Sequence, residues 1–301
     1  MDNRAEIQDF LSSRRGRVQP QDVGLPGPER RRRVPGLKRE EVALLAGVSV
    51  DYYARLERGQ LRGVSDQVLE AIADALRLDE AERTHLRDLA AAAGASPRRQ
   101  RQRPTPTAKV RASVVTLLES MTVPAYVRDA RFDILAANQA CVALYDGVLR
   151  AEALPLNLAR FIFLDARSHA LYRDWDEVAE ATVASLRAQA GRDPMDKPLT
   201  DLIGELMARS HPFATAWAKH DVGRHSTALK RLRNAEVGDL ELTGDALELS
   251  ADGLTVIVYT AAAGSADEEK LRLLCSWNGS APRDDAVVHH GSHVAEHPPA
   301  R

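Results

Sequence analysis

The segment PGLKREEVALLAGVSVDYYARLERGQLRGVSDQVLEAIADALRL, residues 35–78, decides the fold of the N-terminal part of the chain. Within it, two short helical patterns are separated only by the turn Ala46-Gly47-Val48-Ser49. Gly47 suits a turn that needs a positive φ, and Ser49 is a favoured N-cap for the second helix. The spacing therefore predicts a helix-turn-helix, whose second helix fits the major groove of double-stranded DNA.

Three further helices are predicted around this pair, at residues 7–17, 66–77 and 81–93, each with apolar residues along one face. The pair itself is expected at residues 38–46 and 49–58, with Tyr53 and Leu56 pointing inward. Five short helices around a small core predict an all-α domain over residues 1–95. The alternative is a helix-turn-helix that serves only as a packing unit and does not bind DNA.

The stretch LKREEVALLAGVSVDYYARLERG resembles the helix-turn-helix of the Cro/lambda-repressor type, in which the exposed first turn of the second helix reads bases. This resemblance implies base contacts from Ser49, Val50, Asp51, Tyr52 and Arg55. Val50 suits a thymine methyl, Asp51 a cytosine amino group, and Arg55 the O6 and N7 atoms of guanine. Glu57 is expected to cap the helix or pair locally rather than to contact DNA.

Basic residues around the helix pair are expected to hold DNA phosphates, which position a protein without specifying sequence. They are Arg30, Arg31, Arg32, Arg33, Lys38, Arg39 and Arg58. Contacts from the four-arginine run would make the affinity depend on salt concentration. The alternative for that run is a solvated loop with no fixed contact.

The distribution of charge separates the two ends of the chain. Residues 1–103 contain 20 lysines and arginines against 16 acidic residues, whereas the remainder contains 21 against 27. A basic first part fits a partner that carries phosphates. At 301 residues the chain is also long enough for a second domain.

Cysteine usage and hydropathy indicate the cellular compartment of the protein. Cys141 and Cys275 are too few and too far apart for a disulfide framework, and no apolar stretch approaches the roughly 20 residues of a transmembrane helix. The N-terminus is charged rather than signal-like. We therefore expect a bacterial cytoplasmic protein that is associated with the nucleoid through DNA, with no membrane partner.

A linker and a second domain follow. Residues 96–107, SPRRQRQRPTPT, have the composition of a linker. Helices are then predicted at 110–121, 138–145, 158–163, 168–190, 199–209 and 267–274, and strands at 125–127, 132–136 and in three runs after residue 226. These blocks predict an α+β domain with an antiparallel sheet over residues 108–278. Residues 279–301 are expected to form a disordered tail.

The second domain contains no enzyme signature, since it has no glycine-rich nucleotide loop, no GxSxG and no paired metal-ligand spacing. His220, Asp221 and Ser226 are not expected to be catalytic, because neighbours on one segment seldom converge on one point. No catalytic residue, metal site or required cofactor is therefore expected. The alternative for the tail histidines His289, His290, His293 and His297 is weak metal binding, although no packed surroundings are expected to orient them.

Apolar walls with a few polar residues among them are typical of a small-molecule pocket. The candidate lining residues are Asn138, Arg160, Phe161, Phe163, Trp175, Trp217 and His220. For each aromatic residue, the alternative is a place in the hydrophobic core without a ligand.

The segments NLARFIF, LYRDWDEVAEATVASLRAQAGRDP, FATAWAKHDV and VGDLELTGDALELSADGLTVIVYTAAAGS resemble the ligand-binding domain of MmyB-like transcription regulators. The stretch QDVGLPGPERRRRVPGLKREEVALLAGVSVDYYARLERG resembles the DNA-binding half of the same family. This resemblance implies a PAS-like α+β sensor domain, with a fatty-acid-like or other apolar ligand held between helices and sheet. It also implies control of neighbouring genes.

Two positions depart from the family pattern. Ala137-Asn138 stands where the family usually has Trp-Asn, and Asn234-Ala235-Glu236 stands where His-Pro usually precedes Val-Gly. The absence of the tryptophan is expected to enlarge or reshape one wall of the pocket.

The sequence as a whole predicts a DNA-binding transcription regulator whose second domain senses a small apolar ligand. Ligand binding is expected to favour one domain arrangement or dimer geometry over another. A homodimer is expected because one recognition helix reads too few bases for genomic specificity. The alternative is a second domain that binds a protein partner instead of a metabolite. A DNA-tethered enzyme is a third interpretation, which the lack of catalytic motifs disfavours.

Overall fold

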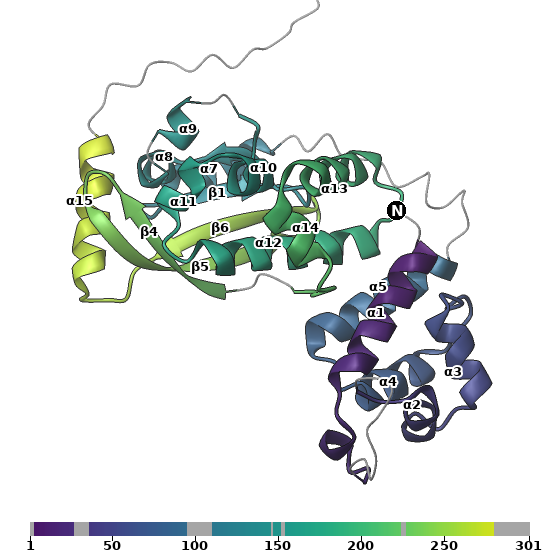
Figure 1. Cartoon of the computed structure of the whole chain (residues 1–301). Coiled ribbons are helices and arrows are strands. Elements are labelled where there is room, and N and C mark those ends of the chain that lie inside the picture. The colour runs from purple at the N-terminus through teal and green to yellow at the C-terminus, as the bar shows by residue number, and fades with distance from the viewer. Residues whose placement is uncertain are drawn as a thin grey trace, which may run out of the picture.

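The computed structural model describes residues 3–26, 36–94, 110–145, 147–151, 154–223 and 227–279. Its N-terminal part is helical (Figure 1). The elements are α1 (Asn3–Arg17), a 3-10 helix (Pro20–Val23), α2 (Arg39–Leu45), α3 (Val50–Glu57), α4 (Asp66–Ala75) and α5 (Glu80–Gly94). The predicted all-α fold of this part is confirmed.

Local signals set the helix-turn-helix. Gly47 has a φ of 65°, the left-handed conformation that glycine adopts without strain. The Ser49 hydroxyl accepts a hydrogen bond from the Tyr52 amide at 3.1 Å and so caps α3. Tyr53 and Leu56 are buried in one cluster with apolar residues of α1, α4 and α5. The turn, the cap and the inward face therefore follow from the residues at these positions.

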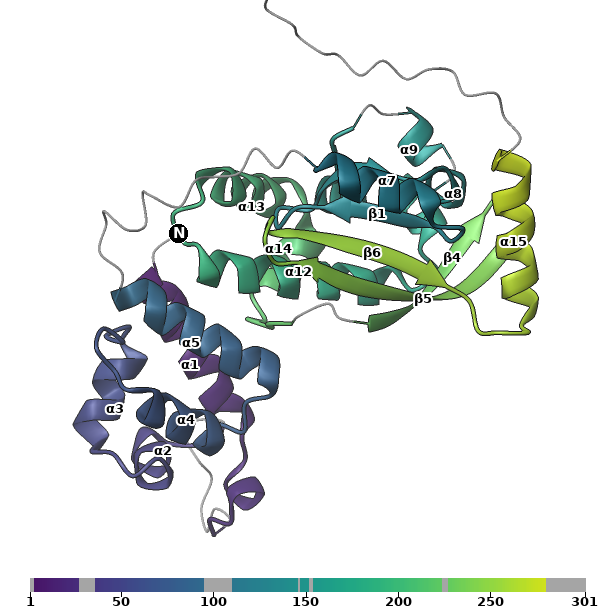
Figure 2. The same ribbon diagram turned by 180° about the vertical axis from the view of Figure 1, so that it is seen from behind.

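The C-terminal part combines helices with one sheet (Figure 2). Its helices are α7 (Ala112–Ser120), α8 (Gln139–Leu144), α9 (Val148–Ala151), α10 (Leu158–Leu164), α11 (Arg167–Leu171), α12 (Trp175–Arg192), α13 (Lys197–Arg209), α14 (His211–Trp217) and α15 (Ala266–Gly279). Its strands are β1 (Ala125–Arg128), β2 (Asp133–Ala137), β3 (Leu156–Asn157), β4 (Thr227–Asn234), β5 (Gly238–Leu249) and β6 (Leu254–Thr260). The predicted α+β class is confirmed. Within the described ranges, no helix is both long and apolar enough to cross a lipid bilayer.

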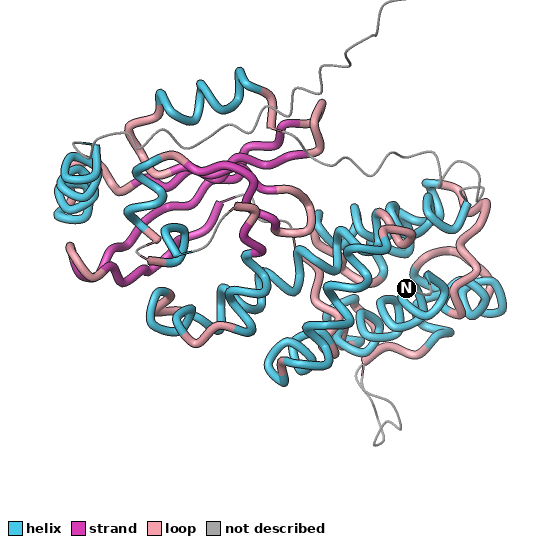
Figure 3. The backbone as a smooth tube through the Cα atoms, turned by 90° about the horizontal axis from the view of Figure 1, so that it is seen from above, coloured by secondary structure: helices cyan, strands magenta, loops and turns pink. Residues whose placement is uncertain are grey.

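The sheet is antiparallel throughout, with the strand order β3-β2-β1-β6-β5-β4. On one face, Val114 and Leu118 of α7 pack against Val127 and Val256. The other face carries a larger apolar cluster that includes Ile257 and residues of α10, α12 and α13. Figure 3 shows the strands as a layer between helical segments. The space between α12 and the sheet is thus inside the domain.

The single helix expected at residues 168–190 is divided into α11 and α12. In the gap, Tyr172 forms a β-bridge with Leu232 of β4, and the Arg173 amide donates to the Arg231 carbonyl at 2.9 Å. The expectation of one continuous helix was wrong, because pairing with the sheet takes this backbone out of the helical conformation.

Four short elements, the 3-10 helix at Pro20–Val23, α9, β3 and α14, have no counterpart in the prediction from sequence. α14 begins after the N-cap Ser210, whose hydroxyl accepts from the Phe213 amide at 3.3 Å, and it has a proline in its first turn. Both are helix-start signals that the sequence carries.

The two edges of the sheet are unequal. β3 has two residues, whereas β4 has eight. The exposed side of β4 forms cross-strand ion pairs with β5, Arg231–Glu241 at 3.0 Å and Arg233–Asp239 at 2.8 Å. Opposite charges across a strand pair favour this register.

The two parts of the chain are in contact. α5 lies beside α12, at the end of the C-terminal domain nearest the helical domain (Figures 1 and 2). Val222, from the segment after α14, is buried in the N-terminal apolar cluster, and Ala188 of α12 packs against the same cluster. The helical domain thus shares part of its core with the C-terminal domain.

Candidate DNA-binding surface and ligand pocket

The first turn of α3 presents side chains to solvent. Val50 is 47% exposed, and Asp51 and Arg55 are also exposed. Tyr52 is half-buried, with the Arg55 guanidinium carbon 5.4 Å from its ring centre. Together with the cap Ser49, these residues form one surface on α3, so the structure brings together the side chains that were predicted to read bases.

Glu57, at the end of α3, is 1% exposed and holds two arginines. Nε of Arg15 donates to Oε1 at 2.9 Å, and Nε of Arg39 donates to Oε2. This hydrogen bond with Glu57 raises the pKa of Arg39. Glu57 therefore pairs locally, as expected, and ties α1 and α2 to the recognition helix. Arg39 is exposed beyond this contact and remains a predicted phosphate ligand.

The other predicted phosphate ligands lie around α3. Lys38 precedes α2, with its ammonium 3.4 Å from Oε1 of Glu40, and the exposed Arg58 follows α3. Arg30, Arg31, Arg32 and Arg33 lie outside the described residues. A hollow beside α3 is lined partly by Arg4, Tyr52, Arg55 and Arg62. Arg4 and Arg62 were not predicted as DNA ligands, although Arg62 follows the predicted phosphate ligand Arg58 closely in the sequence.

A narrow cavity lies between α12 and the inner face of the sheet. Val178, Ala181, Thr182 and Ser185 line it from α12 at the spacing i, i+3, i+4 and i+7, which is one helix face. The remaining lining residues are Tyr126, Arg128, Phe132, Leu158, Ile162, Tyr172, Lys230, Gly244, Ile257 and Tyr259. The cavity volume is about 40 Å³, which holds only a few water molecules.

The lining carries positive charge. The buried Arg128 guanidinium lies over the Phe132 ring, 4.1 Å from its centre, and donates to the Asp129 carbonyl at 3.0 Å. Burial lowers the pKa of Arg128 and also that of the half-buried Lys230, which the Glu177 carboxylate partly offsets. Since none of the lining side chains is acidic, the cavity favours an anionic group.

Tyrosine hydroxyls form a chain at the cavity wall. The Tyr145 hydroxyl lies 3.1 Å from that of Tyr172 and 2.8 Å from that of Tyr259. Tyr126 packs against both Tyr145 and Tyr259, and burial raises its pKa to about 12. These phenols are therefore neutral at physiological pH and act as hydrogen-bond donors and acceptors.

Residues 110–274 match the family model described as MmyB-like transcription regulator ligand binding domain. The chain belongs to this MmyB-like family. Residues 29–86 match the family model of a helix-turn-helix domain. Comparison with curated proteins gives no match. The cavity therefore lies in an MmyB-like ligand-binding domain and α3 in a DNA-binding domain, and together they make the chain a transcription regulator with a ligand-binding domain.

The residues predicted to bind the ligand lie elsewhere in the MmyB-like domain, and none is among the residues that line the cavity. Phe161 belongs to the core, and Phe163 and Trp175 pack edge to face beside it. Asn138 caps α8, and Arg160 pairs with Glu205 at the surface. Trp217 and His220 lie at the contact between the two domains.

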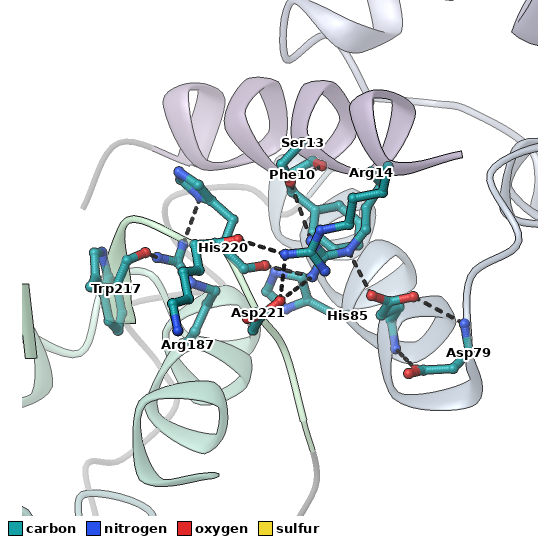
Figure 4. Close-up of polar contacts among 12 residues, drawn as sticks. Phe10, Ser13, Arg14, Asp79, His85, Arg187, Trp217, His220 and Asp221 are labelled. Atoms are coloured by element: carbon teal, nitrogen blue, oxygen red, sulfur yellow. Dashed lines mark hydrogen bonds and ion pairs between the residues drawn. The ribbon is translucent and has the colours of Figure 1, made fainter. Parts of the chain in front are cut away.

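Arg187 of α12 is fully buried at that contact (Figure 4). Its Nη1 lies 2.5 Å from Oε1 of Glu6 in α1 and 3.2 Å from Nδ1 of His220. Its Nη2 donates to the Trp217 carbonyl, and the guanidinium carbon lies 4.1 Å from the Trp217 ring centre. Trp217 and His220 thus hold an arginine that joins the two domains.

Arginines of α1 hold the backbone that follows α14 (Figure 4). Nη2 of Arg14 donates to the His220 carbonyl at 2.6 Å. Arg17 donates to the Lys219 carbonyl at 2.9 Å and pairs with Asp221 at 2.5 Å. Cations at the C-terminal end of a helix are favourable partners for its unpaired carbonyls.

His85 of α5 is buried beside this network. Within the described part of the chain, neither of its ring nitrogens has a hydrogen-bond partner. Burial, and then the charges of Arg187 and Arg14, lower its pKa to about 3. The ring is therefore neutral at physiological pH and forms no ion pair with Glu6, although its Nε2 lies 3.9 Å from that carboxylate.

The depressed pKa of His85 makes the structure sensitive to acid. Below pH 6.5 the unfolded chain binds a proton at this histidine, while the folded chain does so only near pH 3. The free energy of unfolding is therefore expected to fall on acidification through this window, by up to about 1.4 kcal/mol per pH unit from this group. Urea denaturation at several pH values between 7 and 4 should show that the free energy of unfolding falls less steeply with pH for His85→Gln than for the wild type. Equal slopes in both proteins would contradict the assignment.

Proposed function

We propose that this chain is a ligand-responsive regulator that binds an operator in double-stranded DNA through α3, as a homodimer, and takes a fatty-acid-like anion in the cavity beside α12. In this proposal the regulator needs no cofactor and acts on the nucleoid in the cytoplasm. A protein-binding role for the second domain would call for an open apolar groove. The narrow cavity between a helix and a sheet favours a small molecule instead.

The observation that carries the ligand class is the composition of the lining. Leu158, Ile162 and Ile257 offer apolar walls, while Arg128 and Lys230 bring two cations to the same cavity without an acidic side chain. A carboxylate would offset the burial of these cations, and an alkyl chain would contact the apolar walls. A molecule with both groups matches the lining better than a neutral lipid does.

Decanoate is the probe that tests this ligand class. It is expected to raise the melting temperature of the full chain, because a ligand that binds only the folded state stabilises it. Arg128→Met keeps an unbranched apolar stem and removes the charge, and we expect it to weaken decanoate binding about 10- to 100-fold in calorimetric titration.

The matched control is Arg160→Met, which removes an arginine that pairs with Glu205 outside the cavity. It is expected to bind decanoate like the wild type. The wild type should bind decanol more weakly than decanoate. Arg128→Met should bind decanol and decanoate equally well. Equal binding of decanol and decanoate by the wild type would refute a carboxylate site.

The DNA-binding surface makes a separate prediction. Selection from a pool of random duplexes should give the operator, and Arg55→Ala is expected to relax preference at one base position per half-site, by about 1–3 kcal/mol. Arg58→Ala should instead weaken binding to all sequences alike and reduce the dependence on salt.

Sedimentation of the complex should give two chains per selected site. One chain per site with full affinity would exclude the homodimer.

A further inference from the structure

α12 contributes to two sites at once. Val178, Ala181, Thr182 and Ser185 line the cavity along one face of the helix. Arg187 and Ala188 from its second half contact the helical domain. At 3.6 residues per turn, these two faces are roughly 120° apart around the helix axis. A movement of α12 at the cavity therefore changes what its other end presents to α1 and α5.

The contact at the second site is close and depends on a glycine. A Cβ atom at Gly191 of α12 would overlap the His85 ring of α5. His85 is buried and packs edge to face on Phe10, so its ring has little room to move away. The distance between α12 and α5 is thus set by the absence of a side chain at residue 191.

The contact also has a polar part beside the apolar packing of Val222 and Ala188. Its centre is the ion pair between the fully buried Arg187 and the nearly buried Glu6, with Arg14 and Arg17 on backbone carbonyls beside it. A buried ion pair adds little net stability, because both charges regain water when the contact opens. Such a polar centre specifies one arrangement of the domains and adds little to the cost of separating them.

The cavity is too small for a ligand of the proposed class. Its volume of about 40 Å³ holds only a few water molecules, so an alkyl acid must displace a wall. The sheet is held by pairing along β1, β6, β5 and β4, whereas α12 is a single helix laid across it. Because side-chain packing rather than backbone pairing holds α12 on the sheet, we take α12 as the wall that moves.

We propose that α12 couples the two domains: a ligand that fills the cavity displaces α12 and releases the helical domain from its contact with Arg187 and Gly191. This inference rests on the proposed function for the identity of the ligand, but the mechanical coupling does not. By linkage, whatever opens the contact also favours the ligand.

The first test measures the contact without any ligand. In the full chain, Gly191→Ala is expected to open the contact and raise the radius of gyration measured by small-angle X-ray scattering. Gly204→Ala is the matched control, because it makes the same change in helix α13, where a Cβ meets nothing within 4 Å. An unchanged radius of gyration in Gly191→Ala would overturn the assignment of the contact.

The second test fills the cavity with a side chain. Ala181→Phe places a ring on the cavity face of α12 and is expected to shift the radius of gyration toward that of Gly191→Ala. If Ala181→Phe remains folded by circular dichroism and keeps the wild-type radius, filling the cavity does not open the contact and the coupling is refuted. If the ring unfolds the domain, Ser185→Leu makes a smaller filling change on the same face, with the same two outcomes.

The third test uses decanoate as the probe. Gly191→Ala is expected to bind decanoate about tenfold more tightly than the wild type, within the range of ordinary allosteric coupling. Equal affinities, with an open contact in the variant, would refute the coupling and leave the proposed ligand class intact. Absence of decanoate binding in every variant would instead refute the proposed ligand class, while the first two tests still decide the coupling.

Discussion

Replacing Glu57 by alanine is expected to lower the free energy of unfolding of the helix-turn-helix domain by about 3–5 kcal/mol, because the change leaves a nearly buried arginine without its carboxylate. Glu57 is 1% exposed, and Arg15, which donates to it, is 12% exposed. Arg15 also donates to the Leu37 carbonyl at 2.9 Å, so its guanidinium cannot turn toward water without a second loss. Urea denaturation of the full chain, followed by circular dichroism, measures the effect.

The control for this prediction is Glu40→Ala, which removes a 64% exposed carboxylate from α2 and is expected to change stability by less than about 0.5 kcal/mol. Glu57→Gln keeps the shape of the side chain and one accepting oxygen, although its NH2 group faces the other arginine, and we expect it to lose less than Glu57→Ala. A loss for Glu57→Ala as small as that for Glu40→Ala would show that the buried pair does not organise α1, α2 and α3.

Replacing Asn138 by alanine is expected to lower the free energy of unfolding of the ligand-binding domain by about 3–4 kcal/mol, since it removes an N-cap and leaves buried backbone groups unpaired. Its Oδ1 accepts from the Ala125 and Cys141 amides at 3.0 and 2.9 Å. Its Nδ2 donates to the carbonyl of Val123 at 2.8 Å and to that of Leu118 at 3.3 Å. Thermal and urea denaturation measure the loss.

Asn138→Asp separates the effect of the hydrogen bonds that the side chain accepts from the effect of those that it donates. The carboxylate still accepts from both amides, but it faces the carbonyls to which Nδ2 donated. We expect this variant to be less stable than Asn138→Ala at pH 7 and to recover part of its stability near pH 4, where a protonated carboxyl group can donate. Stability of Asn138→Asp equal to the wild type at pH 7 would contradict the role of the amide.

The helix-turn-helix was predictable because its determinants are local. Gly47 and Ser49 each act on backbone within a few residues of themselves, and the inward positions of α3 follow from helical spacing. The same is true of β5 and β6, whose alternating pattern and intervening turn are visible in the sequence. Elements of this kind depend little on the rest of the chain.

The cavity could not be located in the same way. Arg128 ends β1 and Lys230 is one of several basic residues in β4, and only the pairing of β1 with β6 and of β4 with β5 brings these two side chains under α12. The aromatic residues chosen from the sequence illustrate the opposite case. Trp217 has the apolar character of a pocket residue, but its ring lies against Arg187 of α12, which is distant in sequence. Long-range contacts of this kind leave no periodic signal.

The break between α11 and α12 has a similar cause. The apolar pattern continues through this region, so residue spacing alone favours one helix. A bridge from Tyr172 to Leu232 decides the outcome, and it depends on a strand that lies some sixty residues later in the chain. Without it, α12 would not begin where its first turns can face the sheet.

The edges of the sheet have a consequence for how copies of this chain can meet. An unprotected edge strand is a template for another strand, and proteins that expose one tend to join edge to edge. Here β3 is only two residues long, and Tyr172 and Arg173 occupy part of the free side of β4. Neighbouring chains on DNA therefore have little free strand edge through which to pair their sheets. The homodimer proposed above would therefore form through side-chain surfaces, whose geometry can be matched to the spacing of two half-sites.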